Sequence, residues 1–386
     1  MTCRTVMSTL TVAFYISAPF WLAGCSGSSV PPCLECADGD VTPLEVSFVM
    51  AANNRAYAGS GDELVELDVE RLAANYVAVA INGAGSYILV GDRRAYEGRG
   101  ARVIDLGVED LGSGVDAAMN DAGDYVFAGP ERAYVGRGPN ATQLPTEEVG
   151  NFRGVSVAIN SSGTYVIAGH HRAYLGRGTS VTELDVEPLG ESGGVDVAIN
   201  ERGDYVIAGN ARAYVGQEND VQLVTSDLLG LQDEAGVSVA LNEAGNYIVA
   251  GTHRAYAGIG ANATELSVEQ LGWGPKVGAV INEAGDFVLL GTLHGYVGRD
   301  TNVTELRLEL RETTRGADVA MNENGDYILA PGLDTYVGRG TDVTSLGFSP
   351  GAEPSVAINE AGDYLVASRG RAHRGRGDEA LSLIHI

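Results

Sequence analysis

The chain has 386 residues, and its 51 Asp and Glu outnumber its 25 Lys and Arg, which gives a formal net charge of −26. So acidic a protein repels phosphate backbones, and we expect no nucleic acid among its partners. It holds only 6 histidines and one lysine, Lys276. The small number of histidines speaks against a histidine-based metal site, and no cofactor is predicted.

Residues 1–24 have the features of an export leader. Arg4 provides a basic start, and residues 12–24 are mostly apolar but short for a membrane span. The run ends in Leu22-Ala23-Gly24-Cys25, which resembles the lipobox of bacterial lipoproteins. The resemblance implies cleavage before Cys25, a lipid on its sulfur and, with Ser26 next to it, an outer-membrane or cell-surface location. An ordinary leader with a chance cysteine is the alternative.

Residues 25–43 are predicted to be a flexible tether, because they are polar and carry Gly, Ser and Pro. The tether contains Cys33 and Cys36. A C-x-x-C pair can be a redox pair or half of a zinc site, but no second pair and no nearby histidine complete four ligands. We expect a local disulfide between Cys33 and Cys36, as suits an oxidising compartment, and no metal site.

Residues 44–380 are built from a repeat of about 40 residues. Its marker is Asn-x-x-Gly-x-Tyr/Phe, and the marker asparagines are Asn82, Asn120, Asn160, Asn200, Asn242, Asn282, Asn322 and Asn359. In a Gly-rich and Val/Ile/Tyr-rich chain, this period is typical of a β-propeller. A parallel solenoid coil is usually shorter, and a helical repeat would show a period of 3.6 residues.

One copy of the repeat predicts one propeller blade. Alternation and β-branched residues predict short strands at residues 181–186, 195–199, 205–208 and 212–215. Asn200 to Gly203 forms a turn, because Asn closes turns through its side chain and Gly accepts a positive φ. A three-residue turn, Gly209 to Ala211, precedes the last of these strands.

The consensus SVAIN..G.YVIAG...AYVGRGT.VTEL resembles the phenylalanyl-glycyl/glycyl-alanyl-prolyl repeats of integrin alpha chains and their bacterial relatives. It resembles tryptophan-aspartate-type blades almost as closely, and the likeness covers about residues 48–376. Both resemblances imply an all-β propeller. Integrin-type repeats often carry an Asp-rich calcium loop between the second and third strands, but that connection is only three residues long here, so calcium is not implied.

Both ends of the repeat array are incomplete. The first copy begins at a second strand near Phe48, and the last breaks off after His373. Residues 381–386 fit no part of the repeat and resemble a translated sequencing adapter, so we expect them to be an artefact. Nine second strands and eight first strands favour about eight blades with overlap at closure, or a larger ring cut short. A monomer is expected.

A polar ladder is predicted inside the ring. The residue four positions before each marker asparagine is often Asp or Ser, and an arginine often opens the third strand. Because both faces of a blade are covered, we expect these groups to contact each other as a structural device. Acid/base catalysis is the alternative, but it needs a unique constellation. The ladder residues are Asp116, Asp196, Asp318, Arg132, Arg172, Arg212 and Arg254.

The repeated tyrosines are predicted to pack between blades, with an aromatic platform for carbohydrate as the alternative. A binding face is predicted where two kinds of variable segment meet. Successive turns alternate between the ends of a blade, so the loops leading into first strands share one end with the turns between second and third strands. Sequence variation on a constant scaffold is typical of a binding surface. The candidate residues are Phe152, Arg153, His170, His171, His253, Trp273 and Lys276. Alternatively, Phe152 and Trp273 only cover the blade ends.

Together these features predict a non-enzymatic binding scaffold outside the cytoplasm. Its partners would be the membrane, through the lipid on Cys25, and an unidentified protein or glycan. Two alternatives remain. One is a propeller enzyme of the lactonase, glycosidase or quinoprotein class, and the other is a structural protein of the envelope or matrix.

Overall fold

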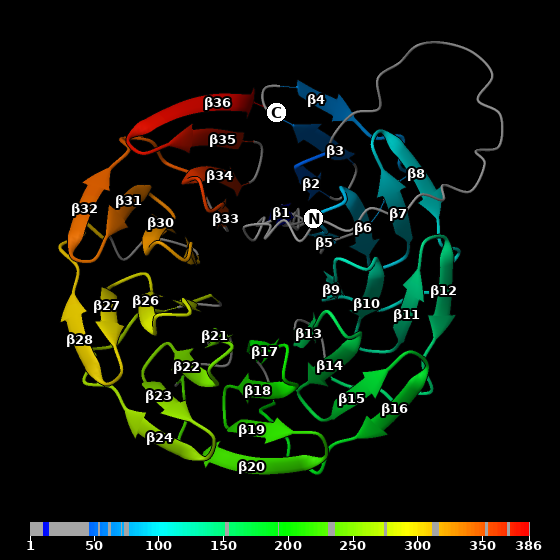
Figure 1. Ribbon diagram of the computed structural model, residues 1–386, viewed down its shortest axis with the longest axis horizontal. Helices are drawn as coiled ribbons and strands as arrows, with labels where there is room; N and C mark the ends of the chain where they lie inside the picture. The colour runs from blue at the N-terminus through cyan, green and yellow to red at the C-terminus, as the bar shows by residue number, and fades with distance from the viewer. Residues whose placement is uncertain are drawn as a thin grey trace, which may run out of the picture.

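A computed structural model describes residues 11–14, 46–52, 55–60, 63–70, 72, 77–150, 154–191, 193–230, 236–273, 276–310, 316–351, 354–368 and 371–385. Nine four-stranded antiparallel sheets form a ring in which each sheet is one blade (Figure 1). Strands follow one another in chain order within a blade, with the first innermost and the fourth outermost. The predicted all-β propeller is confirmed.

The first four blades comprise β1 (Thr11–Phe14), β2 (Phe48–Ala52), β3 (Arg55–Ser60) and β4 (Glu63–Glu66); β5 (Val77–Ile81), β6 (Ser86–Gly91), β7 (Ala95–Arg99) and β8 (Arg102–Asp105); β9 (Asp116–Met119), β10 (Asp124–Ala128), β11 (Ala133–Arg137) and β12 (Asn140–Gln143); and β13 (Val155–Ile159), β14 (Thr164–Gly169), β15 (Ala173–Arg177) and β16 (Ser180–Glu183).

The other five comprise β17 (Val195–Ile199), β18 (Asp204–Gly209), β19 (Ala213–Gln217) and β20 (Asp220–Thr225); β21 (Val237–Leu241), β22 (Asn246–Gly251), β23 (Ala255–Ile259) and β24 (Asn262–Glu265); β25 (Gly278–Ile281), β26 (Asp286–Leu290), β27 (Gly295–Arg299) and β28 (Asn302–Glu305); β29 (Asp318–Met321), β30 (Asp326–Ala330), β31 (Tyr336–Arg339) and β32 (Asp342–Ser345); and β33 (Ser355–Ile358), β34 (Asp363–Ser368), β35 (Arg371–Arg376) and β36 (Glu379–His385).

The blade number corrects the expectation of about eight. The partial first copy does not overlap with the last copy but forms a blade of its own, which pairs with β1 on its inner side. Phe48 and Met50 of this blade pack against Leu365 and Ala367 of the ninth, and this contact closes the ring. Residues 379–385 form the outer strand β36, which includes most of residues 381–386, the segment that fits no part of the repeat. The tether, Cys25, Cys33 and Cys36 lie outside the described residues.

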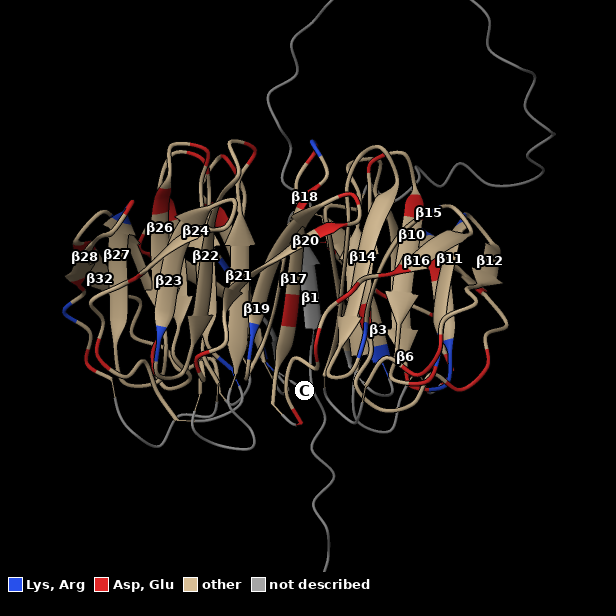
Figure 2. Ribbon diagram, turned by 90° about the horizontal axis from the view of Figure 1, so that it is seen from below, with Lys and Arg blue, Asp and Glu red and all other residues tan. Residues whose placement is uncertain are grey.

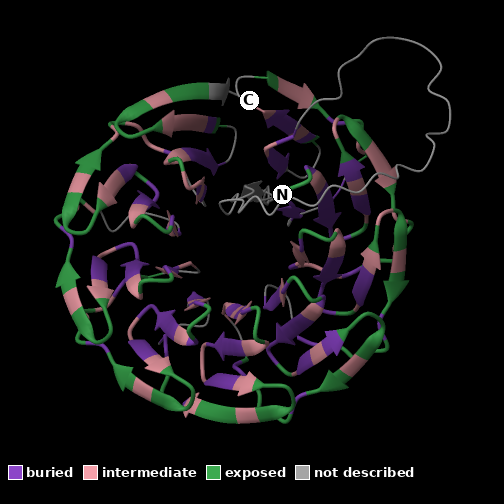
Figure 3. Cartoon of the chain, viewed as in Figure 1, coloured by how far each residue is buried: buried purple, intermediate pink, exposed green. Residues whose placement is uncertain are grey.

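The hydrophobic core lies between neighbouring blades. Val166 and Ala168 of β14, for example, pack against Val197 and Ile207 of the next blade. Second strands such as β18 are buried almost throughout, whereas fourth strands such as β24 are mostly exposed (Figure 3). This explains the sequence pattern, because a strand covered on both faces reads as a continuous apolar run.

In most blades two tyrosines join the layers. Buried Tyr205 donates its hydroxyl to the carbonyl of Glu218 in the turn between the third and fourth strands, at 3.0 Å. The hydroxyl of Tyr214 accepts the amide of Glu187 at 3.2 Å, from the segment that arrives from the preceding blade. Equivalent bonds recur around the ring. The prediction of inter-blade packing is confirmed.

The marker asparagines connect the blades in a ladder. Asn200 accepts the amide of Asp204 at 2.9 Å through Oδ1, and its Nδ2 donates to the carbonyl of Asn242 in the next blade at 3.2 Å. In most blades the residue that follows the asparagine also reaches across: the amide of Glu201, for example, donates to the carboxylate of Glu243 at 3.1 Å. Gly203 has φ 83°, which confirms the turn assignment.

Candidate functional site

The loops that lead into first strands, here called lead-in loops, share one end of the ring with the turns between second and third strands. His170 Nε2, in such a turn, lies 3.1 Å from the carbonyl of Gly193 in a lead-in loop. The ring of His253, in the turn of blade 6, meets Trp273 edge-on at a centroid distance of 5.8 Å. We call this end the binding face. Seen from the side, strands run between it and the opposite end (Figure 2).

Trp273 is exposed but held in place. It is 46% exposed. Its amide donates to Thr292 Oγ1 at 3.1 Å, and the buried Thr292 side chain lies in the turn of the same blade. The His253 ring supports its edge, and Thr252 Oγ1 lies 3.2 Å from His253 Nδ1. A large aromatic side chain supported in this way loses little conformational entropy when a partner covers it.

The candidate histidines do not act as one group. His170 is completely buried, and burial lowers the pKa of its imidazole. His171 beside it is exposed, so the two side chains do not converge as ligands. Partial burial also lowers the pKa of His253. In the described ranges no group of three or more His, Cys, Asp or Glu could hold a metal ion.

Lys276 bridges three blades at the same end. Its Nζ donates to the carbonyl of Pro354 at 3.2 Å and lies 3.6 Å from Asp318 Oδ2. The lysine comes from the lead-in loop of blade 7, Asp318 begins the first strand of blade 8, and Pro354 precedes blade 9. The only lysine therefore ties lead-in loops together next to Trp273. Phe152 and Arg153 of the same candidate set lie outside the described residues.

The first-strand polar residues satisfy the inner edges of neighbouring blades. Asp196 Oδ2 accepts the amide of Val239 at 2.8 Å, and Asp116 Oδ2 accepts the amide of Val157 at 2.9 Å. Asp318 accepts the amide of Val356 in the same way. An innermost strand has no further strand to pair with, so its free amides need such acceptors.

Ser156 joins two of these carboxylates. Its Oγ lies 3.2 Å from Asp116 Oδ2 and 3.2 Å from Asp196 Oδ1. One hydroxyl has a single proton to donate, so a second proton on one carboxyl is needed to satisfy both contacts. Desolvation by burial is the main cause that raises the pKa of Asp196 to about 6, and the negative charge of Asp116 adds to it. Burial also raises the pKa of Asp116.

The prediction that the third-strand arginines contact these aspartates is wrong. Arg172 binds Glu147 and Glu183 at 2.6 Å each, and Arg212 binds Glu187 at 2.6 Å. Arg132 and Arg254 likewise pair with carboxylates of outer segments. The physical reason is position, because a whole strand separates the third from the innermost strand. The arginines therefore clamp outer segments, and the aspartates serve the inner edge.

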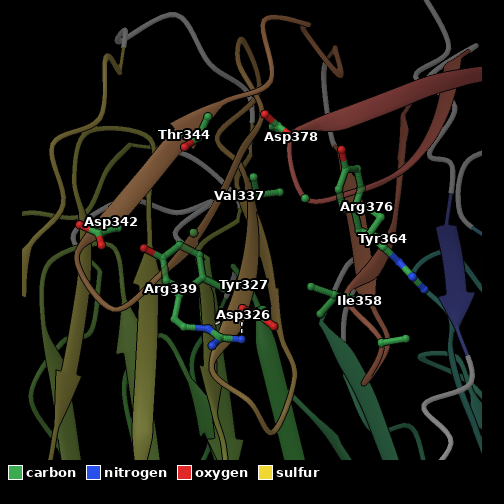
Figure 4. A pocket seen from close by; sticks show the side chains of 14 residues that line it. Asp326, Tyr327, Val337, Arg339, Asp342, Thr344, Ile358, Tyr364, Arg376 and Asp378 are labelled. Carbon is green, nitrogen blue, oxygen red and sulfur yellow. Dashed lines mark hydrogen bonds and ion pairs between the residues drawn. The ribbon is translucent and has the colours of Figure 1, made fainter.

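Grooves also open between blades at the end opposite the binding face. The one between blades 8 and 9 has a volume of 480 Å³, and Figure 4 shows Asp326 and Arg339 facing each other in it. That ion pair has a separation of 2.6 Å, and the Tyr327 hydroxyl donates to the carbonyl of Gly340. Similar grooves follow blades 5 and 6. Asp326, Arg339 and Tyr327 therefore already have partners in the groove between blades 8 and 9. In the other two grooves the Tyr247 hydroxyl, which lines both, is buried without a hydrogen-bond partner among the described residues.

No protein-family model and no curated protein matches the chain. Among solved structures, the C-terminal WD40 domain of Sif2 is similar, with a TM-score of 0.51 and 12% identity over 80% of this chain and 95% of that chain. Virginiamycin B lyase from Staphylococcus aureus gives a TM-score of 0.46 and 11% identity over 65% of this chain and 90% of the lyase. These likenesses concern the propeller fold alone. Within the described residues, no helix has the length and apolar character needed to cross a membrane.

Sequence reasoning missed the Asp116, Ser156 and Asp196 cluster as a unit. The three residues occupy the same position in successive copies, 40 residues apart, so the repeat itself held the information. Aligning the copies as neighbours around a ring would have placed the two carboxylates on either side of the serine.

Proposed function

We propose that the protein is an exported scaffold, anchored to the cell envelope by a lipid on Cys25, which captures a protein or glycan with its binding face. The observation that carries this proposal is the exposed but supported Trp273 among variable loops. Aromatic side chains of this kind are the usual anchors of protein interfaces. Because the chain carries a net charge of −26, a neutral or basic partner suits it best.

We expect Trp273→Ala to weaken partner binding at least about tenfold, since losing an aromatic anchor of an interface costs about 2 kcal/mol or more. Trp21 lies in the leader, so Trp273 is the only tryptophan of the cleaved protein and its fluorescence reports directly on the site. Neutral oligosaccharides and neutral or basic peptides are titrated against this emission in the wild type, and titration calorimetry measures the affinity of the variants.

Ile259→Ala is the matched control. Ile259 is 52% exposed, but it ends a third strand at the opposite end of the ring. A ligand that binds without changing the Trp273 emission, or that loses equal affinity with both variants, would contradict the assignment of the binding face.

We expect Cys25→Ser to move the exported protein from the membrane fraction to the soluble fraction, because the lipobox cysteine carries the anchor. Wild-type protein should take up labelled fatty acid, and Cys33→Ser, in the tether, should leave both results unchanged. A Cys25→Ser protein that still sediments with membranes, together with an unlabelled wild type, would refute lipid anchoring.

A further inference from the structure

Blade 1 obtains its innermost strand from a distant part of the chain. In blades 2 to 9 an Asn-x-x-Gly turn joins the first and second strands, whereas residues 15–47 separate β1 from β2. Phe14 nevertheless lies opposite Phe48, and Thr11 lies opposite Ala51. This is the register of blade 5, where Ile199 lies opposite Tyr205 and Asp196 opposite Ala208.

The sequence of β1 imitates the repeat. Thr-Val-Ala-Phe occupies the place where other blades have Ser-Val-Ala-Ile or Asp-Val-Ala-Met. The next residue is Tyr15, where every complete repeat has its marker asparagine. The strand therefore has the alternation of a first strand but lacks the residue that continues the ladder.

Among the described residues, the ladder can be followed from blade 2 as far as blade 9. Asn322 Nδ2 donates to the carbonyl of Asn359 at 3.1 Å, and the amide of Glu323 donates to Glu360 at 3.3 Å. In the part of the chain that the structure describes, Asn359 Nδ2 donates only to Asp363 of its own blade, at 3.3 Å. No carboxylate of blade 1 receives the amide of Glu360 there. The corresponding donors of blade 9 are Asn359 Nδ2 and the amide of Glu360, and the sequence has Tyr15 and Ile16 at the positions where a repeat has its marker asparagine and the residue after it.

β1 belongs to the leader, which is removed if the protein is exported and cleaved as proposed above. Residues 11–14 lie within the leader, and β1 lies between β33 and β5, next to β2 (Figure 1). Cleavage before Cys25 takes this strand away. The inner edge of β2 then has unpaired backbone groups, beside apolar residues such as Val49 that are fully buried while the ring is complete. Such an edge is a template for strand addition.

We propose that the inner edge of β2 in the leader-free protein is a strand-accepting site, which binds an extended peptide of the first-strand type, with alternating Val or Ile and small residues and a final Asn-Glu. The inference rests on the leader removal stated under the proposed function. Backbone pairing with β2 supplies affinity, and the backbone carbonyl of the final asparagine accepts Asn359 Nδ2. The asparagine side chain supplies selectivity, because its own Nδ2 donates to the carbonyl of Asn82 in blade 2, as Asn322 Nδ2 donates to that of Asn359. The glutamate of the peptide accepts the amide of Glu360 through its carboxylate, as Glu360 accepts the amide of Glu323.

The test uses the chain from Ser26 to Ile386 and a labelled peptide of residues 194–203, GVDVAINERG. Titration should give saturable binding of one peptide per chain and a raised melting temperature, because a ligand of the folded state stabilises it by mass action. Hydrogen exchange should show new protection of Phe48–Ala52. Replacing the peptide asparagine and glutamate by alanine should weaken binding about tenfold or more. A lysine-flanked peptide of residues 10–15 should compete for the same site.

Absence of saturable binding, equal binding of a scrambled peptide, or protection outside β2, β5 and β33 would overturn the proposal. If the leader-free chain does not fold, the peptide is fused through a flexible linker to residue 44. Recovery of a folded monomer by this fusion, and not by its Asn-to-Ala version, supports the proposal, and equal behaviour of both overturns it. The intact mass of the exported protein reports leader removal separately, so failure of the proposed export remains distinguishable.

Discussion

Gly176→Ala is expected to destabilise the protein by about 2–4 kcal/mol, far more than an ordinary exposed substitution. A Cβ at this position would lie 2.3 Å from Cζ and 2.4 Å from the hydroxyl of Tyr165, which is fully buried. The tyrosine would have to move and give up its 3.0 Å bond to the carbonyl of Gly178. Denaturant unfolding followed by circular dichroism measures the loss.

Gly178→Ala is the matched control in the same turn region. Gly178 has φ 54°, but no atom lies within 4 Å of its would-be Cβ. Its replacement should cost only the roughly 1 kcal/mol of a left-handed alanine. Gly176→Ala should also cost less in a Tyr165→Leu background, because the smaller side chain leaves room for the methyl group. Equal losses of stability for Gly176→Ala and Gly178→Ala would show that the contact with the aromatic ring of Tyr165 does not require glycine at position 176.

Asp196→Asn is expected to stabilise the protein above pH 6 by about 1–3 kcal/mol. The folded pKa of about 6 lies above the ordinary value of 3.8, so the folded protein binds more protons between these values. The stabilisation that protonated Asp196 gives the wild-type protein is fully present below the ordinary pKa and is lost as the pH rises through about 6. An uncharged amide avoids that loss. It can accept from Val239 and donate to Ser156, at the expense of the contact from the Val197 amide.

The measurement is the free energy of unfolding from pH 4 to pH 8. The gain of the variant should vanish as the pH falls toward 4. Asp286→Asn provides a control of opposite sign, because Arg299 lowers the pKa of Asp286, and that carboxylate stabilises the fold at neutral pH. If the free energy of unfolding of Asp196→Asn changes with pH in parallel with that of the wild type between pH 4 and 7, the buried carboxyl of Asp196 is not the source of the pH dependence.

Much of the blade could be predicted because its determinants are local. The turn at Asn200 to Gly203 follows from an asparagine side chain and a glycine with positive φ, and both act within a few residues. The continuous apolar run of β18 likewise reflects burial on both faces. The shared end of His253 and Trp273 follows from the alternation of turns and needs no long-range information.

The partners of charged groups could not be predicted in the same way. The sequence pattern predicts that Asp196 contacts a third-strand arginine, but the fold places Asp196 against Ser156 and Val239 of the two adjacent blades. Arg212 instead reaches Glu187, on the segment arriving from blade 4. In a ring, each polar group faces copies of the repeat in both neighbouring blades. Its partner therefore depends on the order of the blades and on whether its strand is an inner or an outer one.

By itself, the sequence determined the repeat, its four strands, its turns and the end of the ring where variable loops gather, because these depend on spacing and on backbone preferences of individual residues. Only the tertiary structure decided that there are nine blades, that His170 is buried beside an exposed His171, and that residues 11–14 pair with β2. The physical reason is that ring closure and burial are properties of all blades packed together, and a strand joins whichever free edge its pattern fits once the other edges are occupied.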